Sequence, residues 1–147
     1  MKISPHILII AICLMAGASS CSLLGRYKLE TKIDQLEHKM PKVITSAMNA
    51  DEIDYDDDKN MVKIKYVWNV TAYDIAWTSA AERKQEVLSL VNINKIDRAL
   101  PELIERAEAG IELEVELADG TDVATITYPN ISTFKAAARG EATDVNE

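Results

Sequence analysis

Residues 111–128, IELEVELADGTDVATITY, constrain the fold more than any other part of the chain. Apolar and polar residues alternate on both sides of Asp119-Gly120, which is typical of strands that bury one face. An Asp-Gly pair favours a two-residue type I′ turn, and this turn sets Leu117 opposite Asp122. We therefore predict an antiparallel hairpin with one apolar face and one polar face.

A second alternating stretch occupies residues 52–65, EIDYDDDKNMVKIK. A four-residue turn at residues 57–60 pairs Ile53 with Ile64 on one face of the hairpin. On the other face, the same register pairs side chains of opposite charge across the two strands. The sequence therefore predicts another hairpin. We interpret its acidic turn as an ordinary Asp-rich hairpin turn and not as a calcium-binding loop, because Lys59 stands where an EF-hand loop needs glycine.

Helical spacing of apolar residues occurs in three places. Residues 29–48 read as an amphipathic helix, which Pro41 is expected to end or kink. A second helical region begins at the capping box Ser79–Glu82 and breaks near Asn92. A further helical segment follows, and Gly110 is a natural stop for it.

The order of helix, hairpin, helices and hairpin predicts an α+β fold. We expect a two-layer domain, in which two antiparallel β-hairpins form a four-stranded sheet with helices on one face. This domain is assigned to residues 29–129. Residues 130–147 are expected to be a polar, partly disordered tail, with one or two helical turns between Ser132 and Arg139.

The first 20 residues have the sequence pattern of an export signal. Lys2 is followed by an uninterrupted apolar run from Ile7 to Ala16, which is too short to cross a hydrocarbon core of about 30 Å. Small residues follow this run, as they do in signal peptides. Cleavage after Ala18, at an A-x-A pattern, would release a soluble chain that starts at Ser19.

Residues 17–21, GASSC, resemble the lipobox of bacterial lipoproteins, in which small residues precede an obligatory cysteine. The resemblance implies a diacylglycerol on Cys21, cleavage before it and acylation of the new amino terminus. The cysteine count favours this outcome, because Cys13 would leave with the signal segment. Cys21 would otherwise be a lone exposed thiol in an oxidising compartment.

The charge of the chain bears on its partners. The net charge of −8 disfavours binding to nucleic acid, whose phosphates are also negative. Residues 21–50 carry five basic and three acidic side chains, so the weakly basic end lies next to Cys21. We expect residues 21–28 to be the lipidated cysteine and a tether. Ser22, rather than Asp, resembles the pattern that sends enteric lipoproteins to the outer membrane, facing the periplasm.

Catalytic, metal and cofactor sites are not predicted. His38 is the single histidine after Cys21, and the sequence holds no G-x-S-x-G motif or glycine-rich phosphate loop. The row Glu112, Glu114 and Glu116 is expected on a solvated sheet face, which does not suit a general acid. We predict a non-catalytic binding domain with an envelope protein or peptide as partner. The alternative is a soluble secreted or periplasmic inhibitor cleaved after Ala18.

Four aromatic residues gather within residues 66–77, YVWNVTAYDIAW. They are a candidate binding patch for a peptide, a glycan or a protein partner. Aromatic side chains more often pack in the core, and we favour the interpretation that these four residues form the part of the core with the largest side chains. The four residues are Tyr66, Trp68, Tyr73 and Trp77.

Overall fold

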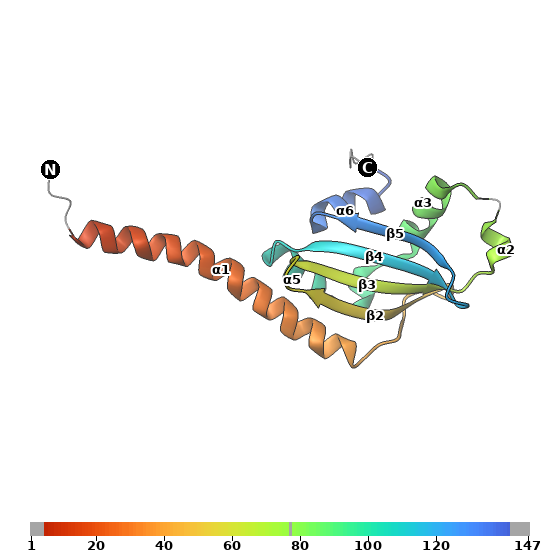
Figure 1. The fold of residues 1–147 in the computed structure, drawn as a ribbon, viewed down its shortest axis with the longest axis horizontal. Helices are drawn as coiled ribbons and strands as arrows, with labels where there is room; N and C mark the ends of the chain where they lie inside the picture. Colours follow the sequence, from red (N-terminus) through yellow and green to blue (C-terminus); the bar gives the residue numbers. More distant parts are fainter. Residues whose placement is uncertain (1–4, 77, 142–147) are drawn as a thin grey trace.

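A computed structural model describes residues 5–76 and 78–141, with side chains from Cys21 onward except those of residues 72 and 73 (Figure 1). The helices are α1 (Pro5–Glu37), α2 (Ala72–Ile75), α3 (Ala80–Leu90), α4 (Ile93–Ile96), α5 (Leu100–Arg106) and α6 (Ile131–Ala138). The strands are β1 (Lys42–Val43), β2 (Met48–Asp56), β3 (Met61–Trp68), β4 (Gly110–Leu117) and β5 (Asp122–Tyr128).

The strands form one mixed sheet in the order β1-β2-β3-β4-β5, in which β3 and β4 are parallel. The predicted α+β class and both hairpins are present, but the expected sheet of four strands in two hairpins is wrong in detail. Helices α2 to α5 form a crossover that returns the chain to the start of β3, where the Gly110 N–H donates to the Asn60 carbonyl at 2.9 Å. The short strand β1 adds an edge beside β2.

The β2–β3 hairpin has the predicted register, with Ile53 opposite Ile64. Its acidic turn is closed by local hydrogen bonds, including one from the Lys59 N–H to the Asp56 carboxylate at 3.1 Å. The turn ends at Asn60, which takes a positive φ of 50°. An Asx-rich turn therefore forms here, as the sequence predicts.

The β4–β5 hairpin follows the predicted register except at its turn. Leu113 lies opposite Ile126, but Glu116 rather than Leu117 lies opposite Asp122. Of the Asp119-Gly120 pair, Gly120 alone has a positive φ, 85°, and its N–H donates to the Leu117 carbonyl at 2.9 Å. The predicted type I′ turn is wrong, because a longer loop with a bulge replaces it.

The sheet has one covered face. Alternate residues of β3 and β4 are buried, and the residues between them are exposed or half-buried. The helices contribute apolar side chains to the same core, as an α+β domain with helices on one face requires. The largest fully buried side chains include Trp68, Tyr66, Tyr128, Leu29, Ile33, Ile104 and Ile111.

The first helical prediction, residues 29–48, is too long. Helix α1 ends at Glu37, the Met40-Pro41 peptide is cis, and residues 42–43 already pair with β2. Proline lacks the N–H that a helix needs, and so the chain turns before it. The capping box at Ser79 is confirmed, with the Ser79 N–H donating to the Glu82 carboxylate at 2.7 Å.

Two predicted boundaries also change. Residues 21–28 are not an extended tether, because they continue α1 into the domain. The predicted tail contains α6, whose Ile131, Phe134 and Ala137 are buried against the rest of the fold. The end of that tail, residues 142–147, lies outside the described residues. Within the described part of the chain, no helix has both the length and the apolar character to span a bilayer.

Candidate anchor and binding surfaces

Cys21 is the first residue whose side chain the structure describes, and it is an exposed free thiol on α1. It borders a shallow hollow that also involves Leu24, Gly25, Lys28 and Arg106. Helix α1 projects beyond the sheet at its N-terminal end (Figure 1). The predicted attachment site is therefore accessible, and it lies on a helix that packs against α5 and β2.

Gly25 allows α1 to approach the end of α5 closely. A Cβ atom at this position would lie 2.6 Å from the Arg106 carbonyl oxygen, a backbone atom. The contact continues through Leu29 and Ile33, both buried on the same face of α1. The position of Cys21 relative to the domain is thus set by helix packing, and sequence reasoning missed this role of Gly25.

Replacing Gly25 with alanine tests this packing. Alanine favours a helix by about 1 kcal/mol over glycine, yet here its Cβ would meet backbone that must shift. We expect Gly25→Ala to lower the free energy of unfolding by about 1–2 kcal/mol, measured by urea denaturation. An exposed control on the same helix, Glu30→Ala, should change it by about 0.5 kcal/mol or less. A more stable Gly25→Ala protein would contradict the close approach.

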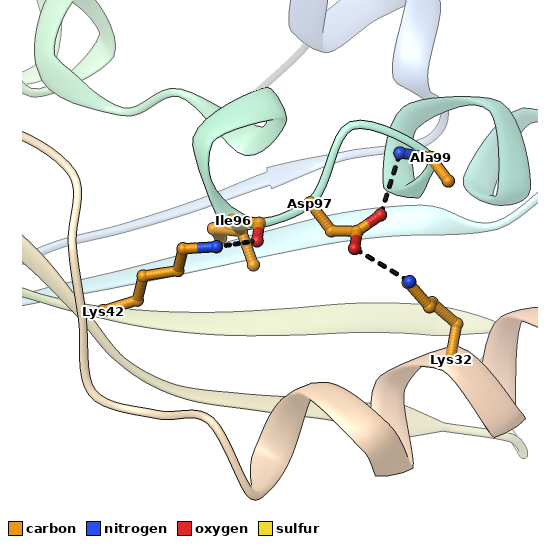
Figure 2. A network of polar contacts seen from close by, with 5 residues as sticks. All are labelled: Lys32, Lys42, Ile96, Asp97 and Ala99. Atoms are coloured by element: carbon orange, nitrogen blue, oxygen red, sulfur yellow. Dashed lines mark hydrogen bonds and ion pairs between the residues drawn. The ribbon is translucent and has the colours of Figure 1, made fainter.

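Polar contacts join α1 and β1 to the end of α4 and the loop that follows it (Figure 2). The Lys32 ammonium lies 2.8 Å from the Asp97 carboxylate, which also accepts the Ala99 N–H at 2.8 Å. The Lys42 ammonium donates to the Ile96 carbonyl at 2.6 Å. Asp97 thus supplies the acceptor at the start of α5, where Ala99 has no capping side chain.

The charge of Asp97 links these contacts to pH. Burial alone would raise the pKa of Asp97, but the Lys32 ammonium and the Ala99 N–H outweigh it and hold that pKa below its ordinary value. A lowered folded-state pKa contributes stability above the unfolded pKa of about 3.9, and this contribution is lost as the pH falls through the folded pKa.

We therefore expect Asp97→Asn to lower the free energy of unfolding by about 1 kcal/mol at pH 7. The difference from wild type should shrink as the pH falls below about 4, because Asp97 is then protonated in the unfolded chain and, at still lower pH, in the folded protein. Denaturation at pH 7 and pH 3 measures both values. Asp34→Asn, an exposed change on α1, is the control. A difference that stays constant across this range would contradict the role of the Asp97 charge.

The candidate aromatic patch is not a surface feature at the two positions that the structure describes. Tyr66 and Trp68 are 0% and 1% exposed and belong to the core. Burial raises the pKa of the Tyr66 phenol. Trp77 and the side chain of Tyr73 lie outside the described residues. The packing interpretation therefore holds for Tyr66 and Trp68, because their strand points them at the helices.

The carboxylate row of β4 lies on the uncovered face of the sheet. Parallel pairing places a lysine row of β3 beside it, with Lys63 next to Glu112 and Lys65 next to Glu114. The Lys65 ammonium lies 3.0 Å from the Glu116 carboxylate, and this hydrogen bond raises the pKa of Lys65. The row therefore serves as the acidic partner of surface lysines. No group of three potential ligands fit for a metal ion occurs among the described residues.

A groove of about 370 Å³ lies between α3, α4 and α6. Its floor is formed by apolar side chains that the core already buries, including Val91, Ile93 and Phe134. Its rim carries the amides of Asn92 and Asn94 and the ammonium of Lys135, together with the Arg139 guanidinium, which is paired with the Glu141 carboxylate at 3.0 Å. Sequence reasoning missed this groove, although Ile131, Phe134 and Ala137 recur at helical spacing.

Comparison with known proteins finds a match in structure. No family model and no curated protein matches the chain, so its folded part is assigned to no named family. The pilotin EpsS of the Vibrio vulnificus type 2 secretion system matches with a TM-score of 0.51 and 14% identity, over 75% of this chain and 92% of that chain. The type II secretion pilotin AspS of Vibrio cholerae matches with a TM-score of 0.52 and 12% identity, over 75% and 93%.

The chain shares the fold of these pilotins. At 12–14% identity the likeness concerns the arrangement of helices and strands, and it assigns no residue a role. The match covers nearly the whole of both pilotin chains, so it is a likeness between complete domains. Function is a separate question, because one fold hosts many functions.

Proposed function

We propose that this chain is a bacterial lipoprotein, held in the cell envelope by acyl chains on Cys21, whose domain binds a protein partner without catalysing a reaction. The observation that carries the proposal is the pilotin fold, together with an exposed cysteine on the helix that enters the domain. Two or three acyl chains anchor a protein firmly without help from its folded part. The location is the outer membrane, with the domain facing the periplasm.

The partner is a segment of an envelope protein, and its docking site is the groove between α3, α4 and α6. An apolar floor with a polar, partly cationic rim suits a peptide that carries apolar anchors and an acidic flank. The similarity to pilotins supports a partner in a secretion or other envelope assembly.

Co-purification from detergent-solubilised envelopes tests this binding site. Ser89 is exposed on α3 and borders the groove, so Ser89→Trp places a bulky uncharged side chain over it and leaves the charge of the rim unchanged. We expect this variant to lose the co-purifying partner by about tenfold or more, a change that one blocked anchor can cause. Ser132→Trp is the matched control, because Ser132 is exposed on α6 but does not line the groove. Equal recovery of the partner with both variants would contradict the groove.

A further inference from the structure

Four large apolar side chains are strongly exposed among the residues that the structure describes, and three of them gather beside Cys21. Leu23, Leu24 and Tyr27 are 64%, 53% and 66% exposed. We call these three residues the anchor patch. The fourth, Val43, lies on β1 and is 71% exposed.

The anchor patch occupies the side of α1 that points away from the domain. Tyr27 follows Leu23 by four residues and Leu24 by three, so the three side chains are neighbours on one face. Gly25 and Leu29 are buried on the opposite face, against the domain. Further along the outward face, Thr31 and Asp34 are polar and exposed. Within the part of α1 from Cys21 to Glu37, the exposed apolar side chains are therefore confined to the residues next to Cys21.

From this arrangement we propose that the anchor patch inserts into the lipid bilayer next to the acyl chains on Cys21. The inference rests on the proposed function, because the lipid on Cys21 brings the patch to the membrane. Tyrosine and leucine suit the boundary between headgroups and acyl chains. Lys28, exposed beside the patch, is placed to meet anionic headgroups, whereas the chain after residue 50 is strongly acidic.

A second protein chain is a poorer occupant of this surface. Three partly exposed side chains offer on the order of a few hundred Å², whereas stable protein interfaces bury about 800 Å² on each partner. A bilayer needs no shape complementarity, and it already lies within reach of a lipid on Cys21. Because Gly25 fixes α1 against α5, insertion of the patch would hold the whole domain in one orientation at the membrane.

Vesicle partitioning measures the contribution of the patch. The protein is residues 21–147, the chain left by cleavage before Cys21, and the buried apolar core lies between Leu29 and Ala137. Its single thiol is alkylated with one tetradecyl chain, which binds membranes only marginally and so leaves side-chain contributions visible. The vesicles contain phosphatidylethanolamine and phosphatidylglycerol.

The double variant Leu23→Ser/Leu24→Ser should lower the partition coefficient about tenfold or more, and Tyr27→Ser should lower it several-fold. Val43→Ser, which removes an equally exposed apolar side chain elsewhere, should leave the coefficient unchanged. Unchanged thermal midpoints show that all the variants remain folded. Patch variants that partition like Val43→Ser would overturn the proposal.

Sedimentation of the same variants tests whether a second copy of the chain, rather than a bilayer, covers the anchor patch. A dimer of the wild-type chain that the patch variants convert to monomer would assign the patch to a second copy and overturn membrane insertion. Vesicle partitioning does not depend on acylation in cells. A chain that carries no lipid in cells would therefore overturn the proposed function, whatever the vesicle result.

Discussion

Leu113→Asp is expected to unfold the domain. Leu113 is fully buried at the centre of β4, and the substitution would place an unpaired carboxylate in the apolar core. The expected loss is about 4–5 kcal/mol or more, which is comparable with the whole stability of a small domain. Circular dichroism and urea denaturation of the purified protein would show the loss of cooperative folding.

The neighbouring residue supplies the control. Glu114 lies on the uncovered face and is exposed, so Glu114→Ala should change the free energy of unfolding by about 0.5 kcal/mol or less. If Glu114→Ala proved as damaging as Leu113→Asp, the register of β4 would be wrong by one residue. The face that carries the carboxylate row would then be the buried one.

Phe134→Ala carries the second large expected effect. Phe134 is 5% exposed on α6, and its ring meets that of Tyr128 edge-on with centroids 5.6 Å apart. Truncating a buried phenylalanine costs about 3–5 kcal/mol, and we expect a loss in this range from denaturation. Ser132→Ala, on the exposed side of the same helix, should have little effect. Equal stability of Phe134→Ala and wild type would mean that α6 is a detachable tail.

Local sequence patterns predicted the two hairpins, but they did not predict the pairing of strands that are far apart in the sequence. Alternation fixed the register at Ile53 and Ile64, because a one-residue shift would reverse both faces. The parallel contact of β3 with β4 depends on a crossover of four helices, and no local pattern encodes it. The turn at Gly120 differed because a single positive φ favours a bulged loop over a type I′ turn.

The candidate sites likewise depend on contacts between residues that are distant in the sequence, which local patterns do not predict. A run of aromatic residues looked like a binding patch, yet Tyr66 and Trp68 lie on the covered face of the sheet. The groove beside α6 could not be located, because it lies between α6 and helices of the crossover, which are far from α6 in the sequence. The contact of Gly25 with Arg106 is likewise between distant residues. Cys21 remains a prediction from sequence, and the structure adds that its side chain is exposed.

The mature N-terminus gives the most direct test of the lipid anchor. Cells that express the full chain are labelled with a fatty acid, and the purified protein is analysed by mass spectrometry. We expect the wild-type chain to begin at an acylated Cys21, and we expect Cys21→Ser to carry no label. A wild-type protein that begins with an unmodified Ser19 would contradict the anchor and favour the soluble alternative, and so would label retained by Cys21→Ser.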